Sequence, residues 1–282
     1  MSYELFGTFH IFTLVLSVIT PFILWLTLRN RKDLTKRIVL LILSLIGVFY
    51  LFLEIFRDGN ILYDLPIHLC ALNGLLIPVV LITKNKTIGN MLLLWSFGAL
   101  GALIFCFEVE MYTTNDLRSW TYFIPHYFQL TLPITIGILK IIDVDYRTIP
   151  KTMLYTFIAY TIVHITNKGF ASLDSSLATN YMFSVWHQNN VFLSFFWKLC
   201  PYQYFYMLLL FPLTIVFVII IYFKQFLNLF VNFIKKCNRK WLHFLFISIF
   251  LLFYNNNIYE FLLYIQLSQL YLFYSYLLFP LL

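Results

Sequence analysis

Long runs of hydrophobic residues, separated by short polar stretches, set the pattern of this chain. About 20 consecutive apolar residues are enough for a helix to cross the hydrocarbon core of a bilayer. Such runs lie at about 6–28, 38–54, 64–82, 88–107, 120–142, 152–168 and 203–223. Because lipid offers no partner for backbone amides and carbonyls, runs of this kind predict α-helices. We therefore expect an all-α fold, a polytopic transmembrane helix bundle of about seven spans.

The last part of the chain differs in amino-acid composition from these runs. From Trp241 to Leu282 it has no glycine, a single charge at Glu260, and mostly Leu, Phe, Tyr and Ile. Its two apolar pieces, at about 241–254 and 258–279, are compatible with a hairpin or an eighth span. We expect a transmembrane bundle over residues 1–235 and a hydrophobic C-terminal tail over 236–282, to which no role is assigned.

Composition and charge agree with a membrane protein. Of the 282 residues 61% are hydrophobic and 11% charged, whereas soluble domains carry about 25% charged residues. Most of the 19 Lys and Arg residues fall on alternate loops. The positive-inside rule then predicts an N-terminus outside and a cytoplasmic Lys235–Lys240 cluster. The net charge of +7 thus reflects topology in a multi-pass cell-membrane protein and not nucleic-acid binding.

The stretch from Asp64 to Gly74 is unusually polar for the start of a hydrophobic span. It contains His68, Cys70 and Asn73. Polar groups in lipid cost free energy unless they are paired, so their presence needs a functional or structural reason. On a helix Cys70, Asn73 and Gly74 share one face, whereas His68 lies roughly 200° from Cys70. A base for Cys70 would then come from another helix.

Four of the predicted helices carry a polar pair at one depth. In each pair a His or Cys is followed three residues later by Thr, Asn or Gln on the same helical face. The pairs are His10–Thr13, Cys70–Asn73, His126–Gln129 and His164–Asn167. At 1.5 Å per residue they lie roughly 6–9 Å below the outer boundary, where the ester carbonyls of phospholipids are found.

A thiol beside a histidine in this layer is suited to acyl chemistry on lipids. The thiolate is the reactive form, and a histidine within hydrogen-bond reach can take the thiol proton as general base. Amide side chains can orient the imidazole or stabilise an oxyanion. The candidate amides are Asn73, Gln129, Asn167 and Asn180.

Each of these residues also has a structural interpretation. A cysteine can pack as a small apolar residue, amides can join helices by hydrogen bonds, and His68 can pair with Asp64. The sequence has no CxxC pair and no close His-x-x-x-His spacing, so neither a metal nor another cofactor is expected. A disulfide between Cys106 and Cys200, both near the outer surface, stays open.

Several segments together resemble the YwaF-like family of bacterial integral membrane proteins, which is related to animal transmembrane protein 164. Leu65–Cys70 is similar to the family's LPLHLC motif. The other matching segments are Phe9-His10, Tyr122–Tyr127, Asn180–Phe183 and Cys200–Tyr202. The resemblance covers about residues 5–225. Family members often have His-His-Tyr where this chain has Pro125-His126-Tyr127.

The resemblance implies a lipid-modifying enzyme, because transmembrane protein 164 is a phospholipid acyltransferase thought to form an acyl-enzyme on the cysteine of the first motif. Carried over, it implies Cys70 as nucleophile and His126 as base. The supporting polar layer would comprise His10, His68, Asn73, Gln129, His164, Asn167 and Asn180. Membrane phospholipids or lysophospholipids would be the partners, and the aromatic segment 169–202 would cover the acyl chain.

Two classes of function therefore follow from the sequence. The first is a lipid acyltransferase or acyl hydrolase that works near the outer leaflet through an acyl-Cys intermediate. The alternative is a non-enzymatic transport or accessory protein of the membrane, in which the polar layer lines a cavity. A structural bundle whose polar pairs only hold helices together is a third interpretation.

Overall fold

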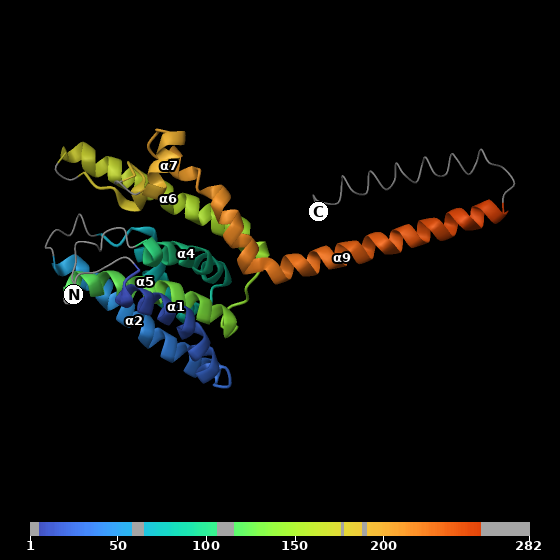
Figure 1. Cartoon of the computed structure of the whole chain (residues 1–282), viewed down its shortest axis with the longest axis horizontal. Helices are drawn as coiled ribbons and strands as arrows, with labels where there is room; N and C mark the ends of the chain where they lie inside the picture. Colours follow the sequence, from blue (N-terminus) through green and yellow to red (C-terminus); the bar gives the residue numbers. More distant parts are fainter. Residues whose placement is uncertain (1–5, 58–64, 106–115, 176–177, 188–190, 255–282) are drawn as a thin grey trace. The chain divides into compact units, whose positions relative to one another are not determined.

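The computed structural model describes residues 6–57, 65–105, 116–175, 178–187 and 191–254, and all its regular elements in these ranges are helical (Figure 1). The first six α-helices are α1 Thr8–Leu28, α2 Asp33–Arg57, α3 Leu69–Thr83, α4 Lys86–Phe105, α5 Leu117–Ile138 and α6 Ile149–Leu173. They are followed by α7 Val191–Leu199, the single turn α8 Phe205–Leu208 and the long α9 Phe211–Tyr254. The predicted all-α fold is confirmed.

Four segments within the described helices are long and apolar enough to cross a membrane. These are Thr8–Leu28, Asp33–Leu53, Lys86–Phe105 and Phe205–Ile234, and α3 is a shorter apolar helix. The helices α5 and α6 have sufficient length but contain more polar residues. The number of seven spans and the outside position of the N-terminus therefore stay predictions.

The helix α9 runs without a break past the predicted end of its span at residue 223. It continues to Tyr254, so the basic Lys235–Lys240 cluster lies within a helix and not in a loop. The sequence explains this continuity, because no Gly or Pro occurs between Pro212 and Tyr254 to end the helix. The chain divides into two compact units, Met1–Phe223 and Lys224–Leu282. The predicted apolar piece at 258–279 lies outside the described residues.

The relative directions of α3, α4 and α5 follow from one short connection and from two hydrogen bonds of Asn90. Only Lys84 and Asn85 separate α3 from α4, and the two helices pack together as an antiparallel hairpin. At the same end, Asn90 of α4 donates from Nδ2 to the Asp143 carbonyl at 2.9 Å and accepts from the Asp145 N–H at 3.0 Å. Since these residues follow α5, α4 is antiparallel to α5 as well. The helices α3 and α5 are therefore parallel and in contact.

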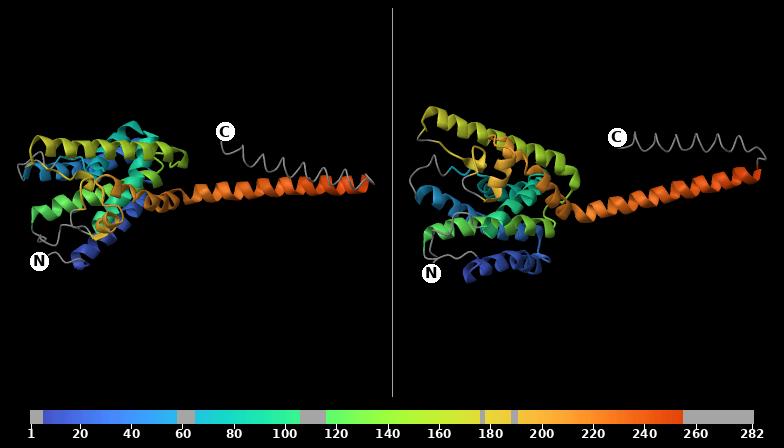
Figure 2. Two further views of the ribbon diagram at one scale, coloured as in Figure 1. Left: turned by 90° about the horizontal axis from the view of Figure 1, so that it is seen from above. Right: turned by 45° about the horizontal axis from the view of Figure 1, so that its top comes forward.

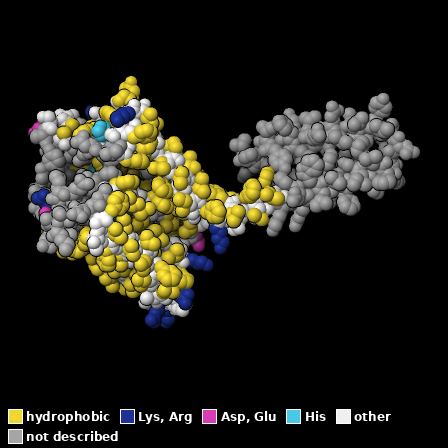
Figure 3. All heavy atoms as spheres, in the orientation of Figure 1, with side chains coloured by type: hydrophobic (Ala, Val, Ile, Leu, Met, Phe, Trp, Pro, Cys, Tyr) yellow, Lys and Arg dark blue, Asp and Glu magenta, His cyan; other side chains and the backbone are white. Residues whose placement is uncertain are grey.

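The first unit has an apolar core beneath an apolar surface. Buried side chains from α2, α3, α4 and α5 form the core, among them Leu40, Ile77, Leu92 and Leu132. The helix α6 lies on the side of α4 away from α1 and α2 (Figure 2). Hydrophobic side chains cover most of the visible face, and Lys and Arg gather where α1 passes into α2 (Figure 3). Such a surface is typical of a bundle surrounded by lipid.

Gly89 allows the residues after α5 to pack closely on α4. A Cβ at this position would clash with Cδ1 of Ile142, whereas a Cβ at Gly101 of the same helix would meet nothing within 4 Å. We expect Gly89→Ala to be less stable than Gly101→Ala by about 1–3 kcal/mol, because the Ile142 side chain must shift in a packed core. Thermal unfolding in detergent measures this difference, and equal melting temperatures of the two variants would contradict it.

The ion pair of Lys86 and Asp145 ties the start of α4 to the segment after α5. Lys86 Nζ lies 2.7 Å from Asp145 Oδ2. The Lys86 ammonium and the Arg147 backbone N–H, both donating to this carboxylate, hold the pKa of Asp145 below its ordinary value. The stabilisation is therefore present above the ordinary carboxylate pKa and is lost as the pH falls through the lowered one.

We expect wild-type protein to lose more thermal stability than Asp145→Asn between about pH 6 and about pH 3. The difference is expected to be modest, because Lys86 is 44% exposed and solvent screens the pair. Melting temperatures of both proteins across this range measure it. An identical pH dependence in the two proteins would show that the pair contributes nothing.

Candidate functional site

Cys70 lies in the first turn of α3. The helix begins at Leu69, His68 precedes it in extended conformation, and no side chain caps the helix N-terminus. The first N–H groups of such a helix lack intrahelical acceptors and carry partial positive charge, which favours a thiolate or an oxyanion beside them. The helical-wheel angle between His68 and Cys70 assumed that both residues lie in one helix, and it does not apply because the helix starts after His68.

His68 connects the first motif to a distant part of the chain. Its Nδ1 accepts a hydrogen bond of 3.2 Å from the backbone N–H of Met182. Its ring packs edge-on against the rings of Tyr181 and Phe183, at centroid distances of 5.1 and 6.2 Å. A neutral imidazole that accepts at Nδ1 carries its proton on Nε2. His68 is therefore oriented as a hydrogen-bond donor at Nε2.

Asn167 fixes the segment with which His68 forms its hydrogen bond. This segment comprises residues 179–184 and is here called the 179–184 turn. Its amide nitrogen donates to the Tyr181 carbonyl at 2.9 Å and to Ser184 Oγ at 2.8 Å. Its amide oxygen accepts from Thr179 Oγ1 at 2.8 Å and from the Tyr181 N–H at 3.1 Å. These bonds use the full hydrogen-bonding capacity of an amide. Asn167 is thus a structural anchor between α6 and the 179–184 turn.

The 179–184 turn has a strained backbone that further contacts support. Met182 and Phe183 both have a φ of 54°, which lies in the left-handed region. The Tyr206 hydroxyl donates to the Phe183 carbonyl, and the Tyr204 N–H donates to the Ser184 carbonyl at 2.8 Å. The sequence analysis did not identify Ser184, Tyr204 and Tyr206 as residues that support this turn. The high density of aromatic residues in this region was the signal that could have indicated them.

His164 and Asn180 also bind around this turn. Nδ1 of His164 and Oγ of Ser184 lie 3.1 Å apart. Asn180 accepts at Oδ1 from the backbone N–H groups of Val185 and Trp186 and donates to the Trp186 carbonyl at 2.7 Å. Asn180 therefore stabilises its own loop, while His164 supports the 179–184 turn from α6.

His10 bridges α1 and α4. Its Nδ1 accepts from the Phe6 N–H at 2.8 Å, so Nε2 carries the proton and donates to the Leu103 carbonyl at 2.7 Å. The side chain is fully buried. Thr13, its predicted polar neighbour, donates to the Phe9 carbonyl of its own helix. With both ring nitrogens engaged, His10 has the geometry of a helix-to-helix contact.

One ring nitrogen of His126 is engaged within its own helix. Its Nδ1 lies 2.7 Å from the Tyr122 carbonyl. Because a carbonyl only accepts, Nδ1 carries the proton and the lone pair lies on Nε2. The Tyr122 ring lies over the imidazole with a centroid distance of 4.5 Å. No residue in the described ranges forms a hydrogen bond with Nε2.

The two amides one turn further along α3 and α5 fix the level of Cys70 and His126. Asn73 Nδ2 donates to the Gln129 carbonyl at 3.3 Å. Since the helices are parallel and in contact, residues one turn earlier on each helix lie at about the same level. These residues are Cys70 and His126. Within the described part of the chain, the Cys70 thiol has no hydrogen bond to another side chain.

The predicted polar layer therefore separates into three groups. Cys70, Asn73, His126 and Gln129 lie along the contact of α3 with α5, whereas His10 joins α1 to α4. His164, Asn167 and Asn180 surround the 179–184 turn, and His68 links this group to α3. Cys70 and Cys200 are free thiols. The sequence left a disulfide between Cys106 and Cys200 open, and Cys106 lies outside the described residues.

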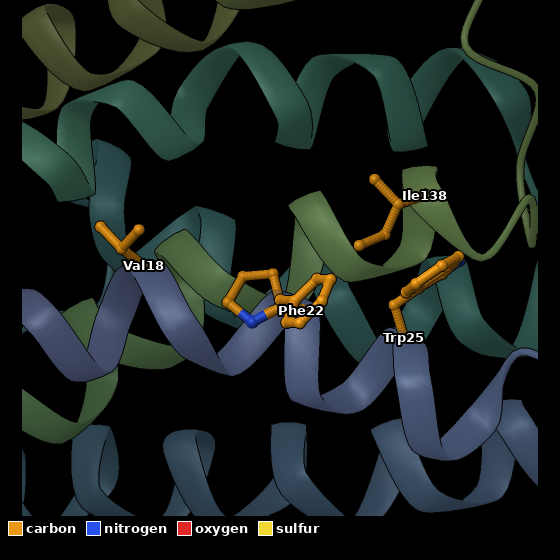
Figure 4. Close-up of a pocket in the computed structure, with 5 residues that line it drawn as sticks. Val18, Phe22, Trp25 and Ile138 are labelled. Carbon is orange, nitrogen blue, oxygen red and sulfur yellow. The ribbon is translucent and has the colours of Figure 1, made fainter.

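A shallow groove between α1 and α5 lies apart from these residues. It is lined by Val18, Pro21, Phe22, Trp25 and Ile138 (Figure 4). The Arg29 guanidinium lies over the Trp25 ring at 4.7 Å, close to the end of α1. The groove is apolar and contains no titratable group, so it suits contact with lipid chains and not bond chemistry.

Apolar helices around a buried polar layer, with a thiol at a helix N-terminus and an oriented imidazole at its level, define a helical membrane protein with a candidate thiol–histidine site. The sequence model of the TMEM164 family matches residues 5–222, so the chain belongs to the TMEM164 family. The predicted relationship to transmembrane protein 164 is confirmed, and the YwaF-like name stays a prediction. Comparisons with curated proteins and with solved structures give no match.

Proposed function

We propose that this protein transfers or hydrolyses acyl groups of membrane lipids through a thioester on Cys70, with His126 as the general base. The observation that carries the proposal is the contact of Asn73 with Gln129. It joins α3 to α5 one turn beyond the thiol and the imidazole, which supports a shared level for these two groups. The tautomer of His126, with its lone pair on Nε2, supports the same assignment.

The first half-reaction begins when His126 Nε2 takes the thiol proton. The sulfur attacks the carbonyl carbon of a lipid ester and forms a tetrahedral oxyanion. The carbon–oxygen bond to the glycerol then breaks, and the leaving alkoxide takes the proton back from His126. The products are a lysolipid and an acyl thioester on Cys70. A second alcohol, or water, accepts the acyl group by the reverse sequence of proton transfers and regenerates the thiol.

Charge stabilisation would come from two features of the same segment. Apolar surroundings disfavour a bare thiolate, so proton removal and charge stabilisation must occur together. The uncapped N-terminus of α3 supplies partial positive charge at Cys70. The Nε2–H of His68, fixed by the bond from Met182, supplies a donor for the oxyanion. A donor of this kind is worth about 10²–10³ in rate.

The 179–184 turn would act as the cover of the acyl chain that we assign to the aromatic segment. Tyr181 and Met182 are buried, and they pack with Tyr160, Val163 and the start of α3. The covering segment was predicted over residues 169–202. Its first residues belong to α6, which continues to Leu173, so the part outside that helix is shorter than predicted. The hydrogen bonds of Asn167 argue for a fixed cover and against a segment that opens widely.

A transport or accessory function is the second candidate. The complete internal bonding of His10 and Asn167 favours structural roles for these two residues. This bonding removes both side chains from any polar path through the membrane. A polar cavity would then lie at the α3–α5 contact. A cavity or packing residue at position 70 tolerates serine, which has a similar size, whereas thioester chemistry does not.

Acyl trapping on Cys70 tests the proposal. The protein is purified from its host membranes, treated with or without neutral hydroxylamine, and digested for mass spectrometry of the peptide that contains Cys70. We expect a hydroxylamine-labile acyl mass on this peptide and none on the peptide that contains Cys200. A free Cys70 thiol that is also unreactive toward lipid-like acyl probes would overturn the enzymatic function.

A further inference from the structure

The apolar groove between α1 and α5 follows the second half of α1. Val18, Phe22 and Trp25 line it from α1, and Ile138 lines it from the end of α5 (Figure 4). Val18 lies at the middle of the 21-residue helix and Trp25 lies near its end, about 10 Å apart along the helix axis. Because α1 is long and apolar enough to cross a membrane, the groove extends from one membrane boundary toward the midplane.

The two helices that form the groove run in the same direction. Near their starts, the Phe9 ring packs edge-on against the rings of Trp120 and Phe123, at centroid distances of 5.8 and 5.5 Å. Further along, the hydroxyls of Thr20 and Tyr127 are hydrogen-bonded to each other. The ends of α1 and α5 therefore lie at the same boundary of the membrane, and the groove opens there.

An arginine without an acidic partner lies at this end of the groove. The Arg29 guanidinium is 4.7 Å from the centre of the Trp25 ring, and within the described ranges Arg29 forms no ion pair. The nearest acid along the chain, Asp33, is engaged by Lys84 and Arg37. A ring beneath a guanidinium limits its motion and leaves its N–H donors unused. Such a guanidinium can bind a phosphate through two parallel hydrogen bonds.

Three further cations surround this boundary. Arg31 and Lys32 belong to the connection from α1 to α2, and Lys140 follows the end of α5 by two residues. All three are exposed, and in the part of the chain that the structure describes none of them is in an ion pair. The charge around the groove is therefore complementary to an anion. The positive-inside rule predicts that this boundary is cytoplasmic, and anionic lipids are concentrated in the cytoplasmic leaflet.

We propose that the groove binds one anionic phospholipid, with the phosphate on Arg29 and the upper part of one acyl chain between Trp25 and Val18. The order of the parts supports this occupant, because a phospholipid also has its charge at the boundary and its chains toward the midplane. Twelve residues of α5 separate His126 from Ile138, about 18 Å along the helix. The inference therefore concerns a second lipid site and does not depend on the proposed function.

Lipid titrations of the full-length protein in a neutral detergent test the site. Dioleoylphosphatidylglycerol is added, and its affinity is obtained from the rise in melting temperature. Dioleoylphosphatidylcholine has the same chains without net charge, and glycerol 3-phosphate has the anion without chains. Arg29→Gln removes the cation; its control, Lys151→Gln, removes an exposed cation at the start of α6, which begins where α5 ends. Val18→Trp fills the groove from an exposed position; its control, Ile19→Trp, adds the same ring to α1 at an exposed residue that does not line the groove.

We expect Arg29→Gln and Val18→Trp to bind phosphatidylglycerol at least about tenfold more weakly than the wild type, and both controls to bind it as the wild type does. Phosphatidylcholine and glycerol 3-phosphate should raise the wild-type melting temperature much less. Equal losses in Arg29→Gln and Lys151→Gln would overturn the site, since surface charge alone would then attract the lipid. An unchanged affinity in Val18→Trp would overturn it as well, because no chain would lie in the groove. An effect of glycerol 3-phosphate as large as that of the lipid would replace the lipid by a free anion and also overturn the proposal.

Discussion

Cys70→Ser is expected to lower acyl transfer by about three orders of magnitude or more and to abolish the hydroxylamine-labile acyl mass. Serine preserves the size of the side chain, so the packing of the first turn of α3 is retained. A hydroxyl ionises far less readily than a thiol, and the partial charge of one helix end cannot make up the difference. Transfer of a labelled acyl chain in vesicles, with initial rates for equal amounts of folded protein, measures the effect.

The control for this prediction is Cys200→Ser, which changes a second free thiol, after the end of α7. We expect its rate to equal that of the wild type. If Cys70→Ser retained the wild-type rate, Cys70 would be a packing residue and the thioester mechanism would be withdrawn.

His126→Gln is expected to lower the rate by about 10²–10⁴, the usual contribution of a general base. Glutamine is close in size to histidine and retains an amide N–H, but it offers no basic nitrogen with the position of Nε2. The wild-type rate should fall at acid pH as the imidazole becomes protonated, and His126→Gln should lose this dependence. Rates measured from about pH 5 to about pH 9 test both statements.

The matched control is His187→Gln, in the loop after the 179–184 turn, where the imidazole lies between the rings of Trp186 and Trp197. We expect its rate and its pH profile to match those of the wild type. If the rate of His126→Gln still fell at acid pH as in the wild type, another group would be the general base.

The helices were largely predictable, because their signals are local. The apolar runs at 6–28 and 88–107 became α1 Thr8–Leu28 and α4 Lys86–Phe105, with ends only slightly displaced. A helix needs only apolar length and hydrogen bonds between near neighbours. The continuation of α9 through the Lys235–Lys240 cluster could have been predicted as well, since the sequence there contains no residue that ends a helix.

The start of α3 was not predictable from local sequence. Pro66 and His68 belong to an apolar run, yet the helix begins only at Leu69. The His68 side chain accepts from the N–H of Met182, and the Leu65 N–H donates to the Tyr181 hydroxyl at 3.3 Å. These partners are more than a hundred residues away in the chain. Periodicity contains no information about them, so a helical wheel treated His68 as a helical residue although it precedes the helix.

The spacing of Cys70 with Asn73 and of His126 with Gln129 was determined by the sequence alone, because residues three apart on a helix share a face. Whether those two faces meet was decided by the tertiary structure, through Gly74 and the bond from Asn73 to the Gln129 carbonyl. The roles of His10 and Asn167 were decided in the same way, by the Leu103 carbonyl and the 179–184 turn. A sequence specifies which polar groups enter the bundle, and only packing determines which of them are satisfied internally and which keep an atom for a substrate.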